Sequence, residues 1–394
     1  MNILITVATY YPDLNGVANV TKYLAEGLKN LGHNIQIITK LSHNNKREEE
    51  INGVKIKRFI LNFNKVKGYN GEIEEYKEFV SNFKCDIMIN VCTQCVTTDV
   101  LLPILNKLKM KKILYVHGFS AIKLKLFKFS RGIKGFFGNL YNFIYWKNIY
   151  YIKLRKYINE YDKIINLTRK DSSKAYLEKY YKRDKIEVLG NAVDDIFLKD
   201  INNESITELE KYGIYKGDKY LLSIANYSPV KNQKLLLDVF YKAKIDTDYK
   251  LIMVGNKENI KYYKKVYNHF LKLKKKYGEK QVLFLTDVER NNIPSIVKNA
   301  KVYLVTSISE EFSISIIEAM SQKVPFISTN VGNVSELKGG IVVNSEKQLI
   351  NELEELLNNN EKMIKLGLEG YHYVIDNCTI DNAIKKLEDI INNI

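Results

Sequence analysis

The sequence predicts an α/β protein made of two doubly wound domains, each built on a parallel β-sheet. The chain has 394 residues, which is more than one ordinary hydrophobic core accommodates. Short apolar segments typical of strands alternate with segments of helical periodicity, which indicates parallel sheets covered by helices. This alternation runs in two series and lapses between them at residues 199–204. Hydrophobic residues make up 45% of the chain, so both domains can bury substantial cores.

The first series predicts an N-terminal domain over residues 1–198. A helix opens at Gly16 and closes at Gly32, with apolar side chains at helical spacing between them. The strands on either side of this helix, and those that follow, are expected at residues 2–8, 35–39, 54–60, 86–91, 112–116 and 163–167.

The second series predicts a C-terminal domain over residues 199–375. Its strands are expected at residues 220–225, 249–254, 281–285, 301–305 and 325–328. Residues 380–394 have the periodicity of an amphipathic helix, and we expect the C-terminal helix, within 376–394, to pack back on the first domain. Doubly wound sheets bind ligands at the carboxyl ends of their strands, so two facing sheets place the site in a central cleft.

The charge of the chain predicts an anionic partner. Lysine and arginine number 61 against 45 aspartate and glutamate residues, for a net charge of +16. Composition alone leaves nucleic acid, an acidic lipid surface and a phosphorylated ligand open. The apolar run at residues 3–8 is a strand rather than a signal peptide, and no stretch of about 18 apolar residues predicts a membrane span. We therefore expect a cytoplasmic protein, either free or bound to the inner face of the membrane.

The four cysteines predict no metal site. Cys92 and Cys95 have the spacing of a metal-binding pair, but the chain holds no second pair to complete a zinc site. We expect reduced thiols near a strand end, with a thioredoxin-like redox pair as the alternative.

Residues 314–320 predict a buried helix that carries one carboxylate. Every residue in this segment is apolar except Ser315 and Glu318, and a helix apolar on most faces is buried. A buried carboxylate needs a partner, which a ribose offering hydroxyl groups would supply. The start of the helix also suits a diphosphate. An ion pair between Glu318 and a core lysine, with Glu310 and Glu311 as ordinary capping residues, is the alternative.

Glu310 followed after seven residues by Glu318, and then by Ala319, Met320, Val324 and Pro325, resembles the signature of the retaining glycosyltransferases of family 4, which have the GT-B fold. The resemblance implies that Glu310 is a catalytic residue beside the donor sugar and that Glu318 holds the ribose. The backbone of Phe312 and Ser313 would face the sugar and the diphosphate. The family usually has glycine where this chain has Glu311 and Ser313. Glu311 narrows the room beside the sugar, whereas Ser313 is a mild departure.

Four further segments carry the resemblance along nearly the whole chain. Residues 11–17 are similar to the first loop of the family, in which Gly16 lets the backbone approach the donor. His117 follows the fifth strand, where the family places a catalytic histidine. Residues 190–194 resemble an Asn-Gly-Val-Asp element. Residues 225–231 resemble the diphosphate-binding Gly-Arg-x-x-x-x-Lys segment: Lys231 matches, but Asn226 replaces the arginine, so one charged donor is missing.

The resemblance implies transfer of a hexose from a nucleoside diphosphate sugar to an acceptor hydroxyl with retention of configuration. UDP is favoured by family frequency, with GDP as the alternative. No cofactor and no essential metal are expected. The acceptor would be a lipid-linked or cell-surface glycan in polysaccharide or lipopolysaccharide synthesis. A nucleotide-sugar epimerase and a phosphorylase of the same architecture remain as alternatives.

Residues 118–159 predict contact with an anionic membrane surface. This stretch contains no aspartate or glutamate, and large aromatic residues are interleaved with its basic ones. Basic and aromatic side chains together suit an anionic bilayer, where a lipid-linked acceptor would be presented. The alternative is that the aromatics are core and the cations merely solvated. The basic residues are Lys123, Lys125, Lys128, Arg131, Lys134, Lys147, Lys153, Arg155 and Lys156.

Two other function classes lack their motifs. A nucleic-acid-binding protein would account for the charge, but no zinc finger, basic zipper or RNA-binding aromatic motif supports it, and we expect no nucleic-acid partner. A dinucleotide-dependent oxidoreductase would need a Gly-x-Gly-x-x-Gly turn after the first strand, where this chain has residues 9–12 of sequence Thr-Tyr-Tyr-Pro.

Overall fold

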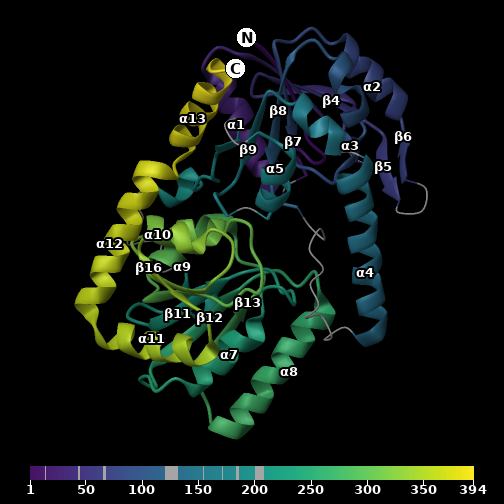
Figure 1. The fold of residues 1–394 in the computed structure, drawn as a ribbon. Coiled ribbons are helices and arrows are strands. Elements are labelled where there is room, and N and C mark those ends of the chain that lie inside the picture. Colours follow the sequence, from purple (N-terminus) through teal and green to yellow (C-terminus); the bar gives the residue numbers. More distant parts are fainter. Residues whose placement is uncertain are drawn as a thin grey trace. The chain divides into compact units, whose positions relative to one another are not determined.

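The computed structural model describes residues 1–13, 15–42, 45–64, 68–119, 132–153, 155–170, 172–182, 186–199 and 208–394, without the side chains of residues 132–137 and 139. Its contacts divide the chain into two compact units, residues 1–190 with 383–394, and residues 191–382. Each unit is built on a mainly parallel sheet with helices on its faces (Figure 1). The predicted fold class of two doubly wound parallel-sheet domains is therefore confirmed.

The N-terminal unit holds an eight-stranded sheet in the order β10-β9-β8-β7-β1-β2-β4-β3. All pairs are parallel except β3 with β4. A separate hairpin is formed by β5 (Leu61–Asn64) and β6 (Gly68–Gly71). The strands of the main sheet are β1 (Asn2–Thr6), β2 (Asn34–Lys40), β3 (Glu48–Ile51), β4 (Val54–Phe59), β7 (Ile87–Val91), β8 (Lys111–Val116), β9 (Lys163–Asn166) and β10 (Ile186–Val188).

The helices of this unit are α1 (Gly16–Asn30), α2 (Ile73–Asn82), α3 (Val96–Asp99), α4 (Gly132–Asn148), α5 (Lys174–Tyr180) and most of α13 (Ile380–Asn392). The C-terminal helix packs against α1 at Gly27, where an added Cβ would lie 2.1 Å from the Ile384 side chain. His33 approaches Glu388 of the same helix at 3.5 Å. Glycine at this position thus lets the last helix join the first unit.

The C-terminal unit holds a six-stranded parallel sheet in the order β13-β12-β11-β14-β15-β16. The order reverses at β11, which pairs with β12 on one side and with β14 on the other. The crevice beyond the carboxyl ends of the strands at such a reversal is where doubly wound folds bind ligands. The strands are β11 (Lys219–Ile224), β12 (Tyr249–Val254), β13 (Val282–Leu285), β14 (Val302–Val305), β15 (Phe326–Thr329) and β16 (Gly340–Val343).

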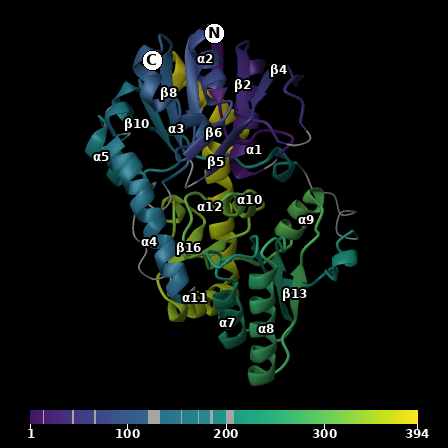
Figure 2. The same cartoon turned by 90° about the vertical axis from the view of Figure 1, so that its right-hand side faces the viewer.

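Helices cover both faces of this second sheet (Figure 2). One buried cluster joins the sheet to α9 (Ile293–Lys298), α10 (Ile314–Ser321) and α12 (Asn360–Asn377). The other joins it to α7 (Gln233–Lys242), α8 (Ile260–Tyr277) and α11 (Glu346–Asn358). Neighbouring strand residues alternate between the clusters: Leu221 belongs to the second and Leu222 to the first. A strand buried on both faces explains the continuous apolar runs in the sequence.

The units differ in two places from the ranges expected from sequence. Contacts place the division after Gly190 rather than after residue 198, because Val193 and Phe197 pack into the core of the C-terminal unit. The C-terminal helix α13 begins at Ile380 rather than near residue 376, after α12 ends at Asn377. The strands β3, β5, β6, β10 and β16 were not anticipated.

Candidate active site

The site is built where two loops meet at the reversal of the C-terminal sheet. The strands β11 and β14 pair in parallel, with Leu221 opposite Val302. Their carboxyl ends therefore lie side by side, and each is followed by a loop leading into a helix, α7 and α10 respectively. Two hydrogen bonds join these loops: the Thr306 hydroxyl donates to the Lys231 carbonyl oxygen at 3.3 Å, and the Ile308 N–H donates to the Val230 carbonyl oxygen at 2.7 Å.

The loop after β11 owes its shape to a glutamine and a glycine. The Gln233 side chain donates to the carbonyl oxygens of Ala225 and Asn226, at 3.4 and 3.1 Å. Gly255, at the end of β12, lies so close that an added Cβ would be 2.1 Å from the Ala225 carbonyl oxygen. Only glycine admits this approach of two backbones. The loop is thereby held in place before α7 begins.

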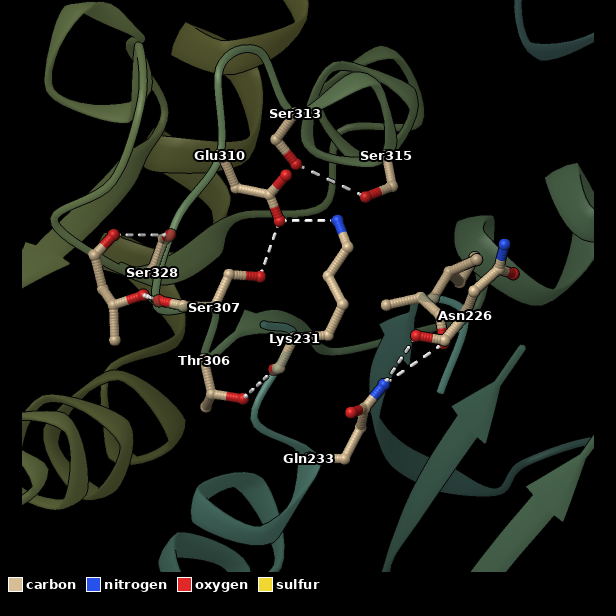
Figure 3. A network of polar contacts seen from close by, with 12 residues as sticks. Asn226, Lys231, Gln233, Thr306, Ser307, Glu310, Ser313, Ser315 and Ser328 are labelled. Carbon is tan, nitrogen blue, oxygen red and sulfur yellow. Dashed lines mark hydrogen bonds and ion pairs between the residues drawn. The ribbon is translucent and has the colours of Figure 1, made fainter. Parts of the chain in front are cut away.

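Lys231 and Glu310, both predicted from sequence, form an ion pair at the centre of this site (Figure 3). The Lys231 Nζ lies 2.6 Å from Glu310 Oε1, and the Ser307 hydroxyl donates to the same oxygen at 2.6 Å. The Glu310 side chain is 11% exposed and that of Lys231 is 32% exposed. A carboxylate and an ammonium group are thus oriented together at the carboxyl edge of the sheet, with one carboxylate oxygen fixed by two donors.

Asn226 contributes no charge to this ion pair. Its side chain is exposed and is drawn apart from Lys231 and Glu310 in Figure 3. The Asn256 N–H lies 3.5 Å from Asn226 Oδ1, which is a long contact. The position that holds arginine in the resembling family therefore offers only a neutral amide here, and Lys231 supplies the positive charge beside Glu310.

The start of α10 follows Glu310 directly. Ser313 is the residue before the helix, and its N–H donates to Asn333 Oδ1 at 3.4 Å, so this N–H already has a partner in the chain. Phe312 is partly buried against the core. Gly332, with a φ of 53°, lets its loop approach the site: an added Cβ would lie 2.8 Å from the Glu311 carbonyl oxygen. The backbone around Phe312 and Ser313 therefore lies in the loop between β14 and α10, at the carboxyl edge of the sheet.

Glu318 lies in the buried interior of α10 and is 4% exposed. Its Oε1 accepts a hydrogen bond from Arg290 Nη2 at 2.6 Å, and the same nitrogen lies 3.3 Å from Asp194 Oδ2. Burial raises the pKa of Glu318 above its ordinary value, and the charge and hydrogen bond of Arg290 oppose that rise. The expected burial is confirmed, and the partner in the chain is an arginine rather than the core lysine considered from sequence.

Sequence reasoning missed Arg290 and the role of Ser307. The sequence did contain a signal for Arg290, because it is the only arginine between residues 191 and 382, a stretch rich in lysine. Arginine differs from lysine in its planar, multi-donor geometry, which suits two carboxylates at once. Asp194 belongs to the element at residues 190–194 that supported the resemblance, so this element and Glu318 are joined through one guanidinium group.

The two remaining predicted residues lie in the N-terminal unit. Gly16 is the first residue of α1, and an added Cβ there would meet nothing within 4 Å, so space is open beside it. His117 directly follows β8, with its ring centroid 4.4 Å from that of Tyr115. The His117 Nε2 is buried, and no hydrogen-bond partner is found for it among the described residues. Burial lowers the pKa of His117 to about 4, so the imidazole is neutral at pH 7.

The cysteine pair has the properties of structural thiols. Cys92 and Cys95 are free, and burial raises the pKa of both. A buried thiol with a raised pKa is a poor nucleophile, which disfavours the redox alternative. Within the described ranges, no three His, Cys, Asp or Glu side chains group as metal ligands.

The basic, aromatic stretch at residues 118–159 is only partly described. Lys123, Lys125, Lys128 and Arg131 lie outside the described residues, as does the side chain of Lys134. In the remainder, Phe119, Trp146 and Tyr150 are buried in the core, whereas Tyr141, Ile144 and Ile152 are exposed. The aromatics thus divide between core and surface. Over the described part of the chain, no helix combines the length and apolar character needed to cross a bilayer.

Comparison with known proteins agrees with this architecture. Residues 14–196 match the family described as Glycosyltransferase Family 4, and residues 204–393 match the family described as Glycosyl transferases group 1. An N-acetyl-alpha-D-glucosaminyl L-malate synthase of Bacillus anthracis is 30% identical over 155 residues, which cover 39% of this chain and 37% of that protein. A trehalose synthase of Thermococcus litoralis is 22% identical over 265 residues, covering 64% of this chain and 61% of the relative.

Among solved structures, an Anabaena protein crystallised with UDP and glucose has a TM-score of 0.71 at 14% identity, over 100% of both chains. At that identity the likeness concerns the fold. The matched segments span less than two thirds of the two curated relatives, whereas the two family matches together take in nearly the whole chain. The chain therefore belongs to the group 1, family 4 glycosyltransferases with the GT-B fold.

Proposed function

We propose that the protein transfers a sugar, with retention of configuration, from a nucleoside diphosphate sugar to an acceptor hydroxyl, and that UDP is the nucleotide. The observation that carries this proposal is the Lys231–Glu310 pair at the reversal of a doubly wound sheet, in a chain of this family. The binding of UDP and glucose by the Anabaena neighbour supports the choice of nucleotide.

In this proposal, each polar site residue of the C-terminal unit named above has a role. Negative charge accumulates on the diphosphate as the glycosidic bond to the sugar breaks, and the Lys231 ammonium stabilises it. The Glu310 carboxylate, held on one oxygen by Ser307 and Lys231, offers its second oxygen to the sugar. Glu318 accepts hydrogen bonds from the ribose hydroxyls. The backbone of Phe312 and Ser313 and the neutral Asn226 amide contact the rest of the donor. The proposal includes no cofactor and no metal-dependent step.

Donor binding is tested by thermal shift with UDP, GDP, their hexose conjugates and uridine. A ligand that binds only the folded state adds about 2.7 kcal/mol at a hundredfold excess over its Kd. We expect UDP and its conjugates to raise the Tm by several degrees, since one kcal/mol moves the Tm by roughly 2–4 °C in domains of this size. Lys231→Met should reduce the UDP shift and spare that of uridine. If no nucleoside diphosphate shifts the Tm, the donor assignment is wrong.

His117 acts, in this proposal, as a neutral polar contact to the donor sugar and the transition state. We expect His117→Ala to lower kcat about 10- to 100-fold, the value of one hydrogen bond to a charged centre. Because the pKa of His117 lies near 4, the imidazole stays neutral from about pH 5 upward and loses that state only as the pH falls through 4. The wild-type pH–rate profile should therefore show no His117 inflection between pH 5 and 8. An inflection near pH 6.5 that vanishes in His117→Ala would contradict this role.

The acceptor, in this proposal, is a lipid-linked or cell-surface glycan presented at an anionic membrane surface, to which residues 118–159 bind. The exposed side chains of Tyr141, Ile144 and Ile152 support this, together with the exposed Lys147 and Lys153 nearby. Apolar and basic groups side by side suit the interface of an anionic bilayer. Such binding weakens as salt rises, and the vesicle experiment below measures it.

A further inference from the structure

The long helix α8 of the C-terminal unit uses one face to pack and leaves the other exposed. Val266 and Leu273 are buried, and the Phe270 ring lies 5.4 Å from that of Phe284 on β13. His269 Nε2 lies 2.8 Å from Asp238 Oδ1 on α7. These contacts secure the inner face of the helix to the unit, whereas most residues on the opposite face are exposed.

The exposed face is strongly basic. The helix has seven lysines and no acidic residue in its 18 residues. Of the lysines of this helix, only Lys274 takes part in an ion pair within the described residues, with Glu279 at 2.5 Å. The other six lysines are exposed: Lys261, Lys264, Lys265, Lys272, Lys275 and Lys276. This concentrates an uncompensated positive charge on one surface of the donor-binding unit.

An apolar stripe runs along the same exposed face. Ile260, Tyr267 and Leu271 are each 40–47% exposed. They follow one another at seven and four residues, so they lie on one side of the helix, away from the buried Val266 and Leu273. The partly exposed Tyr267 borders the packed side, because its ring lies 5.5 Å from that of Phe284. Lys264 falls four residues after Ile260, and Lys275 four residues after Leu271, which places cations beside the stripe.

We propose that this face of α8 binds an anionic lipid bilayer. A polyanion would pair with the lysines but would leave the exposed aliphatic side chains of Ile260 and Leu271 in water. A bilayer interface accommodates both, because Ile260 and Leu271 enter the acyl boundary while the lysine stems extend along it toward the headgroups. This face and residues 118–159 belong to different units, and the proposal does not depend on the glycosyl-transfer proposal.

The consequence is a second membrane-binding element in one chain. Each basic residue near an anionic surface contributes modestly, and a second attached element binds at a raised effective concentration. The donor-binding unit thus has its own affinity for the surface.

The experiment measures cosedimentation of the full chain with phosphatidylcholine vesicles, with and without phosphatidylglycerol, at low and raised salt. Three triple lysine-to-glutamine variants remove equal charge: Lys264, Lys272 and Lys275 on α8; Lys147, Lys153 and Lys156 in the N-terminal unit; and the exposed Lys338, Lys347 and Lys365 as a control. We expect the α8 variant to bind anionic vesicles about 10- to 100-fold more weakly than the control. A fourth variant, Leu271→Gln, leaves the charge unchanged and should weaken binding about 10-fold.

Equal binding by the α8 and control variants would overturn the proposal, because only the net charge of the chain would then matter. Wild-type binding by Leu271→Gln would also overturn it, in favour of a polyanion surface. Loss of binding only in the Lys147, Lys153 and Lys156 variant would support membrane binding by the N-terminal unit and would contradict membrane binding by α8. Unchanged circular dichroism and an unchanged melting temperature show that each variant is folded.

Discussion

Replacing Glu310 with glutamine is expected to lower kcat by about 10²–10³-fold while changing the donor KM little. Glutamine keeps the size of the side chain and an acceptor for Lys231 and Ser307, but it removes the negative charge. Removing one preorganised electrostatic contact to a transition state costs that much in other enzymes. Both constants are measured by steady-state kinetics with a nucleoside diphosphate sugar, in which the released nucleotide is the product that is monitored.

The coupling of Glu310 to Lys231 sharpens this prediction. Because the pair is partly solvated, with Lys231 32% exposed, it should contribute only about 1 kcal/mol or less to unfolding free energy. Both single variants should therefore melt near the wild-type temperature, and their effect should appear in turnover.

In a double-mutant cycle, the effects of Lys231→Met and Glu310→Gln on turnover should be non-additive, because the residues act as one unit. Wild-type kcat in Glu310→Gln would remove Glu310 from the mechanism.

The second large effect is expected at Glu318. Glu318→Ala should weaken UDP binding about 10- to 100-fold, which corresponds to lost hydrogen bonds to a charged acceptor. The test compares UDP with 2′-deoxy-UDP by calorimetry. The wild type should prefer UDP because Glu318 accepts from the ribose hydroxyls, and Glu318→Ala should lose that preference. If Glu318→Ala still prefers UDP over 2′-deoxy-UDP, Glu318 does not hold the ribose hydroxyls, whatever the change in overall affinity for UDP.

Replacing Arg290, the ion-pair partner of Glu318, gives a variant to compare with Glu318→Ala. Arg290→Met leaves the buried Glu318 carboxylate unpaired, and should cost roughly 1–3 kcal/mol of unfolding free energy, less than a fully buried pair because Arg290 is half exposed. Without Arg290 the pKa of Glu318 rises further, so the folded state takes up a proton that the unfolded state has released. The stability deficit should therefore be small at acid pH and grow as the pH rises. Arg290→Lys should recover only part of the loss. A deficit that does not depend on pH would exclude Glu318 as its cause.

Several features of the site followed from local sequence. The apolar run around Glu318 predicted burial, because a helix with apolar residues on most faces has no exposed side on which to place a carboxylate. The strands of both sheets were predicted within a residue or two wherever they are continuous and apolar, as at β12. The hairpin β5–β6 and the strand β16 were missed, because each of these four-residue segments contains Gly or Asn, which weaken a strand pattern.

The partners of the site residues required the tertiary structure. Lys231 and Glu310 are 79 residues apart, and they meet because β11 and β14 are neighbours in the sheet. Arg290 and Glu318 are 28 residues apart, and no local pattern predicts that the turn before α9 would reach the buried face of α10. The sequence alone determined the two doubly wound sheets and the positions of the polar residues at the strand ends, since periodicity and burial act locally. Strand order decided which of these residues meet, because pairing across the sheet is a long-range property of the chain.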